Sequence, residues 1–121
     1  MRSTRSRLRT GSNSASGVNI FVAVSAATFL ASVATVEAAV VHVDAHGIAF
    51  VPAAIKAHAG DVVEWTNKDF VAHTATARSG AWDISLPVGK TGRVTLTKAG
   101  AIDYYCRVHP NMTGRIDVSA K

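Results

Sequence analysis

Short runs of alternating apolar and polar residues dominate the chain after its first 39 residues. Val41 and Val43 alternate with His42 and Asp44, and residues 62–67 are rich in β-branched and aromatic side chains. A period of two places successive side chains on opposite faces of a strand, and no long segment shows the 3.6-residue period of a surface helix. The pattern therefore predicts strands and no long helix.

Turn residues divide these runs into seven or eight short strands, because Gly, Pro, Asn and Asp favour chain reversals. The expected strands cover 40–44, 48–50, 53–58, 62–67, 73–77, 92–97, 101–106 and 114–118, with a brief extended piece at 82–84. Many short strands within about 80 residues are typical of a sandwich. We therefore expect an all-β fold, a small antiparallel β-sandwich.

The first 38 residues have a different composition and are typical of a secretory signal. An apolar run at 20–31 follows a basic start, and small residues then lead to Ala38. The basic start contains Arg2, Arg5, Arg7 and Arg9. We expect cleavage after Ala38, which leaves 39–121 as an exported domain in the periplasm. A retained membrane anchor and an organellar transit peptide are the alternatives.

Length and charge narrow the classes of function. A chain of 121 residues that is 48% hydrophobic holds one domain at most once a leader is removed. The formal net charge of +5 lies mainly in the leader, because nine Lys and Arg stand against seven Asp and Glu from residue 39 onward. No basic stripe carries interleaved aromatic residues, so nucleic-acid binding is not expected.

One segment near the end of the chain gathers soft metal ligands. Cys106, His109 and Met112 occur within seven positions, and His73 can join them from a neighbouring strand. Two imidazoles, one thiolate and a weak axial thioether form the ligand set of electron-transfer copper sites. Cys106 is the only cysteine and cannot close an intramolecular disulfide, so a metal is the remaining support for a small exported domain. A structural zinc site and a Cys–His nucleophile are the alternatives.

These residues carry a family resemblance to the type 1 blue copper proteins, the cupredoxins. It covers 60–67, His73 with Thr74, and 100–114, and the Cys-x2-His-x2-Met spacing is similar to the short ligand loop of amicyanins. This chain has Ala72 and Thr74 where amicyanins and plastocyanins have Pro and Asn, although the Thr74 hydroxyl can still form a hydrogen bond. The resemblance implies a Greek-key sandwich with one copper ion. Its implied ligands are His73, Cys106, His109 and Met112.

The resemblance also implies a soluble, monomeric periplasmic carrier of one electron. Four protein ligands leave no open position for a substrate, so we expect no enzymatic activity. We also expect no membrane span in the mature chain. The expected electron port is His109, with Pro110 in a small docking patch. The expected partners are transient redox proteins such as c-type cytochromes or a periplasmic dehydrogenase.

The alternative function is a periplasmic copper chaperone or reservoir. His42 and His46 share a strand face with Asp44 and could form an accessory metal site in such a protein. If cleavage occurred after Ala39, His42 would become the third residue and could join a terminal copper chelate. Glu37 would then occupy a position that prefers small residues, which argues against that cleavage site.

Overall fold

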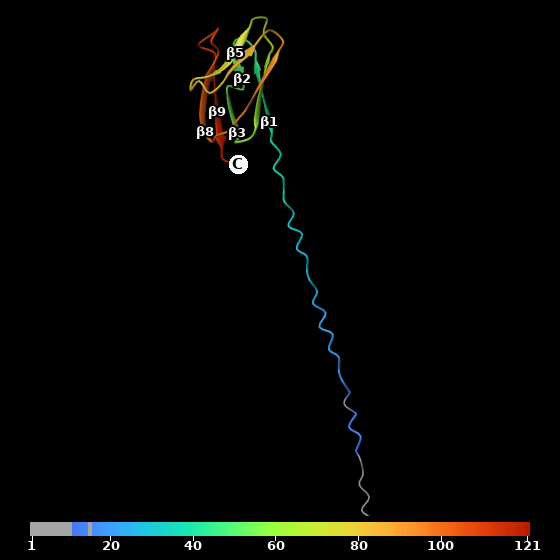
Figure 1. The fold of residues 1–121 in the computed structure, drawn as a ribbon. Coiled ribbons are helices and arrows are strands. Elements are labelled where there is room, and N and C mark those ends of the chain that lie inside the picture. Colours follow the sequence, from blue (N-terminus) through green and yellow to red (C-terminus); the bar gives the residue numbers. More distant parts are fainter. Residues whose placement is uncertain (1–10, 15) are drawn as a thin grey trace, which may run out of the picture. The chain divides into compact units, whose positions relative to one another are not determined.

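The computed structural model describes residues 11–14 and 16–121, which divide into two units (Figure 1). The first unit, Met1–Val33, has neither helix nor strand among its described residues. The arginines of the predicted basic start lie outside the described residues; they are Arg2, Arg5, Arg7 and Arg9. In the described part of the chain, no helix is long and apolar enough to cross a membrane.

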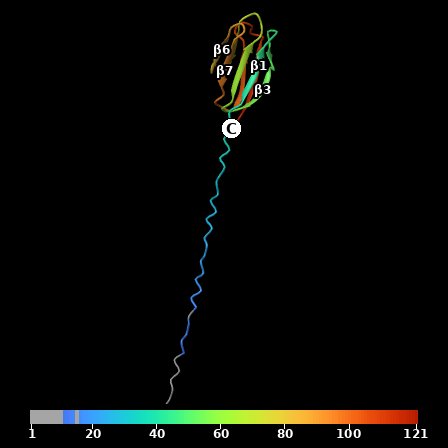
Figure 2. The ribbon, with the colours of Figure 1, turned by 90° about the vertical axis from the view of Figure 1, so that its right-hand side faces the viewer.

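The second unit, Ala34–Lys121, contains two packed sheets, and the predicted all-β sandwich is confirmed. One sheet has the strand order β2-β1-β4-β7 and the other has the order β3-β9-β8-β5-β6. The strands are β1 (Val40–Ala45), β2 (Phe50–Val51), β3 (Ala54–His58), β4 (Val62–Asn67), β5 (His73–Ala77), β6 (Asp83–Leu86), β7 (Thr91–Thr95), β8 (Gly100–Tyr105) and β9 (Thr113–Ser119). The strands β6 and β7 belong to different sheets and lie side by side at one edge (Figure 2).

Two pairings differ from the antiparallel expectation. Strand β1 runs parallel to β4, and β3 runs parallel to β9, whereas the other five pairings are antiparallel. A tight hairpin cannot connect parallel neighbours, because the chain must first return to the same end of the sheet. Between β1 and β4 the chain passes through β3 in the opposite sheet, and each sheet contains one parallel pair.

The strand expected at 48–50 begins later than predicted. Ile48 has a φ of 53°, in the left-handed region that an extended strand does not contain. The backbone N–H groups of Gly47 and Ile48 donate to the carboxylate of Asp69 at 2.7 and 2.9 Å. Because this turn reverses the chain, β2 starts only at Phe50.

An aromatic cluster joins the two sheets around Tyr104. The ring centroid of Tyr104 lies 4.7 Å from that of Phe50, 5.5 Å from Trp65 and 5.7 Å from Trp82. Phe50 and Trp65 come from the first sheet, and Tyr104 comes from the second. Large aromatic rings contribute much of the hydrophobic free energy of a small core. Since β8 continues directly into Cys106, this cluster also fixes the base of the segment that carries the thiol.

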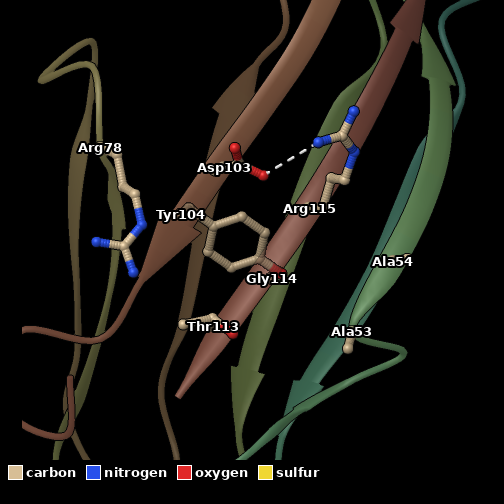
Figure 3. Close-up of a pocket in the computed structure, with 8 residues that line it drawn as sticks. All are labelled: Ala53, Ala54, Arg78, Asp103, Tyr104, Thr113, Gly114 and Arg115. Carbon is tan, nitrogen blue, oxygen red and sulfur yellow. Dashed lines mark hydrogen bonds and ion pairs between the residues drawn. The ribbon is translucent and has the colours of Figure 1, made fainter. Parts of the chain in front are cut away.

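Gly114 makes room for Tyr104, which lies opposite it in the pairing of β8 with β9 (Figure 3). A Cβ atom on Gly114 would overlap the ring and the hydroxyl of Tyr104. That hydroxyl is buried and has no hydrogen-bond partner among the described residues, and burial raises the pKa of Tyr104 to about 12. Above the ring is an open groove, flanked by Arg78 and by Arg115, whose guanidinium contacts the Asp103 carboxylate at 3.5 Å (Figure 3).

We predict that Gly114→Ala lowers the free energy of unfolding by about 1–3 kcal/mol, because the added methyl group displaces Tyr104 in a packed core. Urea unfolding followed by tryptophan fluorescence measures this loss. Thr113→Ala, at the exposed neighbouring position of the same strand, is the matched control and should change stability by less than about 0.5 kcal/mol. Equal stability of the Gly114→Ala protein and the wild type would contradict the overlap.

Candidate metal centre

Three potential ligand atoms converge at one end of the sandwich. The Sγ atom of Cys106 lies 3.8 Å from Nδ1 of His73 and 3.9 Å from Nδ1 of His109. All three atoms lie within 4.8 Å of one another, and the two imidazole ring centroids are 5.0 Å apart. Among the described residues, this is the one group of three or more His, Cys, Asp or Glu side chains placed to hold a metal ion.

Two paired strands and one short loop bring these residues together. His73 is the first residue of β5, and Cys106 directly follows the end of β8. The two strands pair antiparallel, with Thr76 opposite Tyr105, so the start of β5 meets the end of β8. The sequence therefore placed both residues at the correct strand ends, although β8 stops one residue before the predicted end.

The loop that carries His109 closes on its own backbone. The N–H of Cys106 donates to the carbonyl of Met112 at 2.9 Å, and the N–H of Met112 donates to the carbonyl of His109 at 2.8 Å. Met112 is buried with 2% of its surface exposed, and His109 is half-buried. The four predicted residues, His73, Cys106, His109 and Met112, thus form one cluster that is typical of a type 1 copper site.

Thr74 connects the strand of His73 to the ligand loop. Its backbone N–H donates to Cys106 Sγ at 3.3 Å, and its hydroxyl accepts the backbone N–H of Arg107 at 2.9 Å. The hydrogen bond expected from the Thr74 hydroxyl is confirmed. This hydrogen bond holds the loop at Arg107, beyond Cys106, where the pairing of β5 with β8 has already ended.

The Thr74 hydroxyl also belongs to a directed chain of hydrogen bonds. Thr76 Oγ1 donates to Asp83 Oδ1 at 2.7 Å, so its single proton is committed to the carboxylate. The 2.9 Å contact between the two threonine hydroxyls must then be donated by Thr74. The Thr76 hydroxyl and the Arg107 guanidinium, 3.1 Å from Asp83, lower the pKa of Asp83. The Arg107 backbone and side chain therefore both bind to this hydrogen-bonded series, the backbone to Thr74 and the side chain to Asp83.

Asp69 orients His73, a role for which the sequence contains no separate signal. Its Oδ2 atom lies 2.8 Å from Nε2 of His73. Because a carboxylate accepts the proton on Nε2, the lone pair of Nδ1 faces Cys106 and is available to a metal. The N–H of Ile48, then the contact with His73 and the N–H of Gly47, lower the pKa of Asp69 to about 2 against the opposing effect of burial. A carboxylate four residues before a ligand histidine is the only trace of this pair in the sequence.

Asn67 holds the loop that delivers Asp69. Its side-chain amide donates to the carbonyls of Val71 at 2.8 Å and Leu86 at 2.9 Å. Its Oδ1 atom accepts the backbone N–H of Asp69 at 2.9 Å. Asn67 is 1% exposed, so these bonds satisfy a buried amide while fixing both ends of the loop before His73.

The environment of Cys106 favours the thiolate. Burial opposes ionisation, but the N–H of Thr74 and the contacts with His109 and His73 together lower the pKa of Cys106 to about 6. The thiolate is the form that binds soft metals. The site therefore offers a sulfur that is favoured as the thiolate, beside the imidazole rings of His73 and His109.

The accessory site considered for His42, His46 and Asp44 is not assembled. Each of these side chains faces a different partner. His42 Nδ1 lies 3.2 Å from Glu64, and His46 Nδ1 lies 3.8 Å from Asp69. Asp44 contacts the Lys68 ammonium group at 3.2 Å. Among the described residues, these three side chains thus contact separate partners and do not converge on one position.

Comparison with known proteins places this geometry in a familiar fold. Residues 18–118 match the family of the cupredoxin-like domain. A reduced amicyanin variant is 24% identical with a TM-score of 0.59, covering 66% of this chain and 82% of that protein. The purple cupredoxin from Nitrosopumilus maritimus is 22% identical with a TM-score of 0.59, covering 65% and 99%. The copper-containing nitrite reductase from Thermus scotoductus SA-01 is 29% identical with a TM-score of 0.61, but the match spans 70% of this chain and 23% of that enzyme.

We predict that Thr74→Val lowers the free energy of unfolding of the metal-free protein by about 1–3 kcal/mol. The substitution preserves the shape of the side chain but leaves the N–H of Arg107 without its acceptor. Urea unfolding measures the loss, and Thr74→Ser, which keeps the hydroxyl, is the matched control with a smaller loss. Equal losses in the two variants would show that the hydroxyl does not fasten the loop.

We predict that Asp69→Asn weakens copper binding by roughly 10–100-fold, because a neutral amide replaces the carboxylate that orients His73, and its single oxygen cannot accept from both Gly47 and His73. Competition with a chelator of known affinity measures the change. Asp44→Asn removes a carboxylate whose partner is a surface lysine, so it should leave copper affinity unchanged. Unchanged affinity in Asp69→Asn would contradict the orienting role.

Proposed function

The chain belongs to the family of cupredoxin-like domains, and on that premise we propose that it is a type 1 copper protein that carries single electrons between redox proteins. The observation that carries this proposal is the convergence of His73, Cys106 and His109, with the buried Met112 closing the loop. The fold comparisons support the same reading, because amicyanin and a purple cupredoxin share this architecture.

The residues of the cluster fit a copper ion. Separations of 3.8 and 3.9 Å between Sγ and the Nδ1 atoms leave the space that N and S ligands about 2.0–2.3 Å from a shared ion require. We propose that His73, Cys106, His109 and Met112 hold the ion. A bound copper ion would supply a one-electron couple.

The surroundings of the cluster suit electron transfer and not substrate turnover. Asp69 fixes the ring of His73, and Thr74 fixes the sulfur of Cys106 and the start of the loop. Ligands that are held in place change little between two oxidation states, which keeps the cost of each electron transfer low. Metal-assisted catalysis requires an open position for substrate, and four protein ligands leave none.

His109 is the proposed outlet for electrons. The His73 side chain is fully buried, whereas His109 is half-buried and lines a shallow hollow of about 380 Å³. The hollow is lined by Ile48, Val108, His109, Pro110, Asn111 and Met112. Ile48 and Val108 are 51% and 55% exposed, so exposed apolar side chains flank the imidazole. A small apolar contact suits the brief encounters of electron carriers.

The proposed partners are redox proteins outside the cytoplasm, such as c-type cytochromes or a periplasmic dehydrogenase. The leader is the support for a periplasmic location, since its basic start, apolar run and small residues have the order of an export signal. The single cysteine of the described domain, Cys106, is a free thiol that lies in the ligand cluster and accepts a hydrogen bond from Thr74.

A copper chaperone or reservoir is the alternative, and the geometry favours it less. Handing over copper requires ligands that leave readily, whereas His73 and Cys106 are buried and bonded to Asp69 and Thr74. The additional histidines His42 and His46 face carboxylates and not each other. A chaperone would release copper to an acceptor protein, and a carrier would retain it through repeated reduction and oxidation.

We predict that the domain loaded with Cu(II) shows an intense visible band from thiolate-to-copper charge transfer and a reversible one-electron couple. Cys106→Ser should abolish the band, because an alkoxide or hydroxyl cannot replace the soft thiolate. The double variant His42→Ala with His46→Ala is the matched control and should retain the band. A colourless protein that binds zinc in preference to copper would overturn the proposal.

A further inference from the structure

Ala39 is held at both of its backbone ends, immediately before β1 begins. Its N–H donates to Oδ1 of Asp61 at 3.0 Å, and its carbonyl accepts the N–H of Val62 at 2.9 Å. The second bond begins the parallel ladder in which Val40 pairs with Val62. By contrast, residues 34–38 are exposed and belong to no strand. The ordered backbone of the sandwich therefore starts at residue 39.

The acceptor at this point is a carboxylate that is largely withdrawn from solvent. Asp61 is 7% exposed, and its other oxygen accepts the N–H of His58 at 2.8 Å. The N–H groups of His58 and Ala39 lower the pKa of Asp61 against the opposing effect of burial, with the charges of His58 and Lys121 adding to the decrease. The His58 ring lies 3.7 Å away and is 68% exposed, so no buried cation faces this carboxylate among the described residues.

We propose that the Ala38–Ala39 bond is a processing site and that the α-ammonium group freed on Ala39 binds Asp61. Hydrolysis by an endopeptidase adds water across the amide bond, which gives a carboxylate on Ala38 and an ammonium group on Ala39. The neutral N–H donor at 3.0 Å from Asp61 becomes a charged donor at the same place. A charged donor forms a stronger hydrogen bond to a carboxylate than an amide does.

The same contacts distinguish this bond from its neighbour. Cleavage after Ala38 keeps both hydrogen bonds of Ala39, and the exposed residues 34–38 give a peptidase access to the bond. Cleavage after Ala39 would remove both bonds, leaving one Asp61 oxygen without its donor and the N–H of Val62 without its acceptor. The inference concerns maturation of the chain and holds whether or not the domain binds copper.

The first test is the mass and N-terminal sequence of the full-length chain after expression in a bacterium that exports it. We expect a single product that begins with Ala39. A product that begins with Val40, or one that retains the leader, would overturn the assignment.

The second test is the titration of the α-amino group of this product, followed by NMR. In the wild type, the ion pair should raise the pKa of the amine above its value in Asp61→Asn. Asp44→Asn, which removes a carboxylate from β1 that contacts Lys68 and not Ala39, should titrate like the wild type. Because His58 and Lys121 are present in all three proteins, they do not account for a difference. Equal midpoints in the wild type and Asp61→Asn would overturn the ion pair.

The wild type alone provides a test if Asp61→Asn does not fold. If folding raises the pKa of the amine, the ammonium group stabilises the fold fully at pH values below the ordinary pKa of about 7.7–8.0. This stabilisation is lost as the pH rises through the pKa of the amine in the folded protein. We therefore expect the amine of the folded wild type to titrate above its own midpoint in urea. A midpoint at or below the value in urea would contradict the proposal.

Discussion

The geometry of the metal centre depends on the hydrogen bonds between Thr74 and the loop that begins at Cys106. The pairing of β5 with β8 ends at Thr76 and Tyr105, so backbone ladder bonds do not reach the ligands themselves. Thr74 replaces the ladder there, with its N–H on the sulfur and its hydroxyl on the N–H of Arg107. Two segments more than 30 residues apart in sequence are thereby held at a fixed separation beside the ligands.

The polar side chains around Thr74 and His73 form two series of hydrogen bonds, and each series ends at an aspartate. Asp83 accepts from Thr76, which accepts from Thr74, and Asp69 accepts from His73 and from the turn at Ile48. Each chain ends on a carboxylate whose pKa is lowered, so each remains an acceptor at neutral pH. Buried polar networks specify one arrangement when every member has a partner. The aromatic cluster around Tyr104 does not have this property, since the described residues provide no hydrogen-bond partner for its hydroxyl.

Local patterns were sufficient to predict most of the fold and the ligand cluster. Alternation in 62–67 located β4 to the residue, because every second side chain of that strand is buried in the core, and the polar loop before residue 73 located the start of β5. Parallel pairing of β1 with β4 was not predictable in this way, since alternation is the same for both directions. Ile48 was misplaced because its left-handed conformation accompanies a hydrogen bond to the carboxylate of Asp69, 21 residues away, which local alternation does not reveal. Asp69 itself appeared as one polar residue in a loop, and its partner was visible only in three dimensions.

The two imidazoles of the centre are mechanically unequal. His73 is enclosed, stands at the start of a fully buried strand and is bonded to a carboxylate that also ties down a neighbouring turn. His109 is carried by a short loop whose rim is open to contact. A protein that docks on that rim would contact the half-buried His109 and not the buried His73. A docked partner would therefore reach the site from the loop side, where His109 and Met112 line the hollow, and not from the strand side of His73.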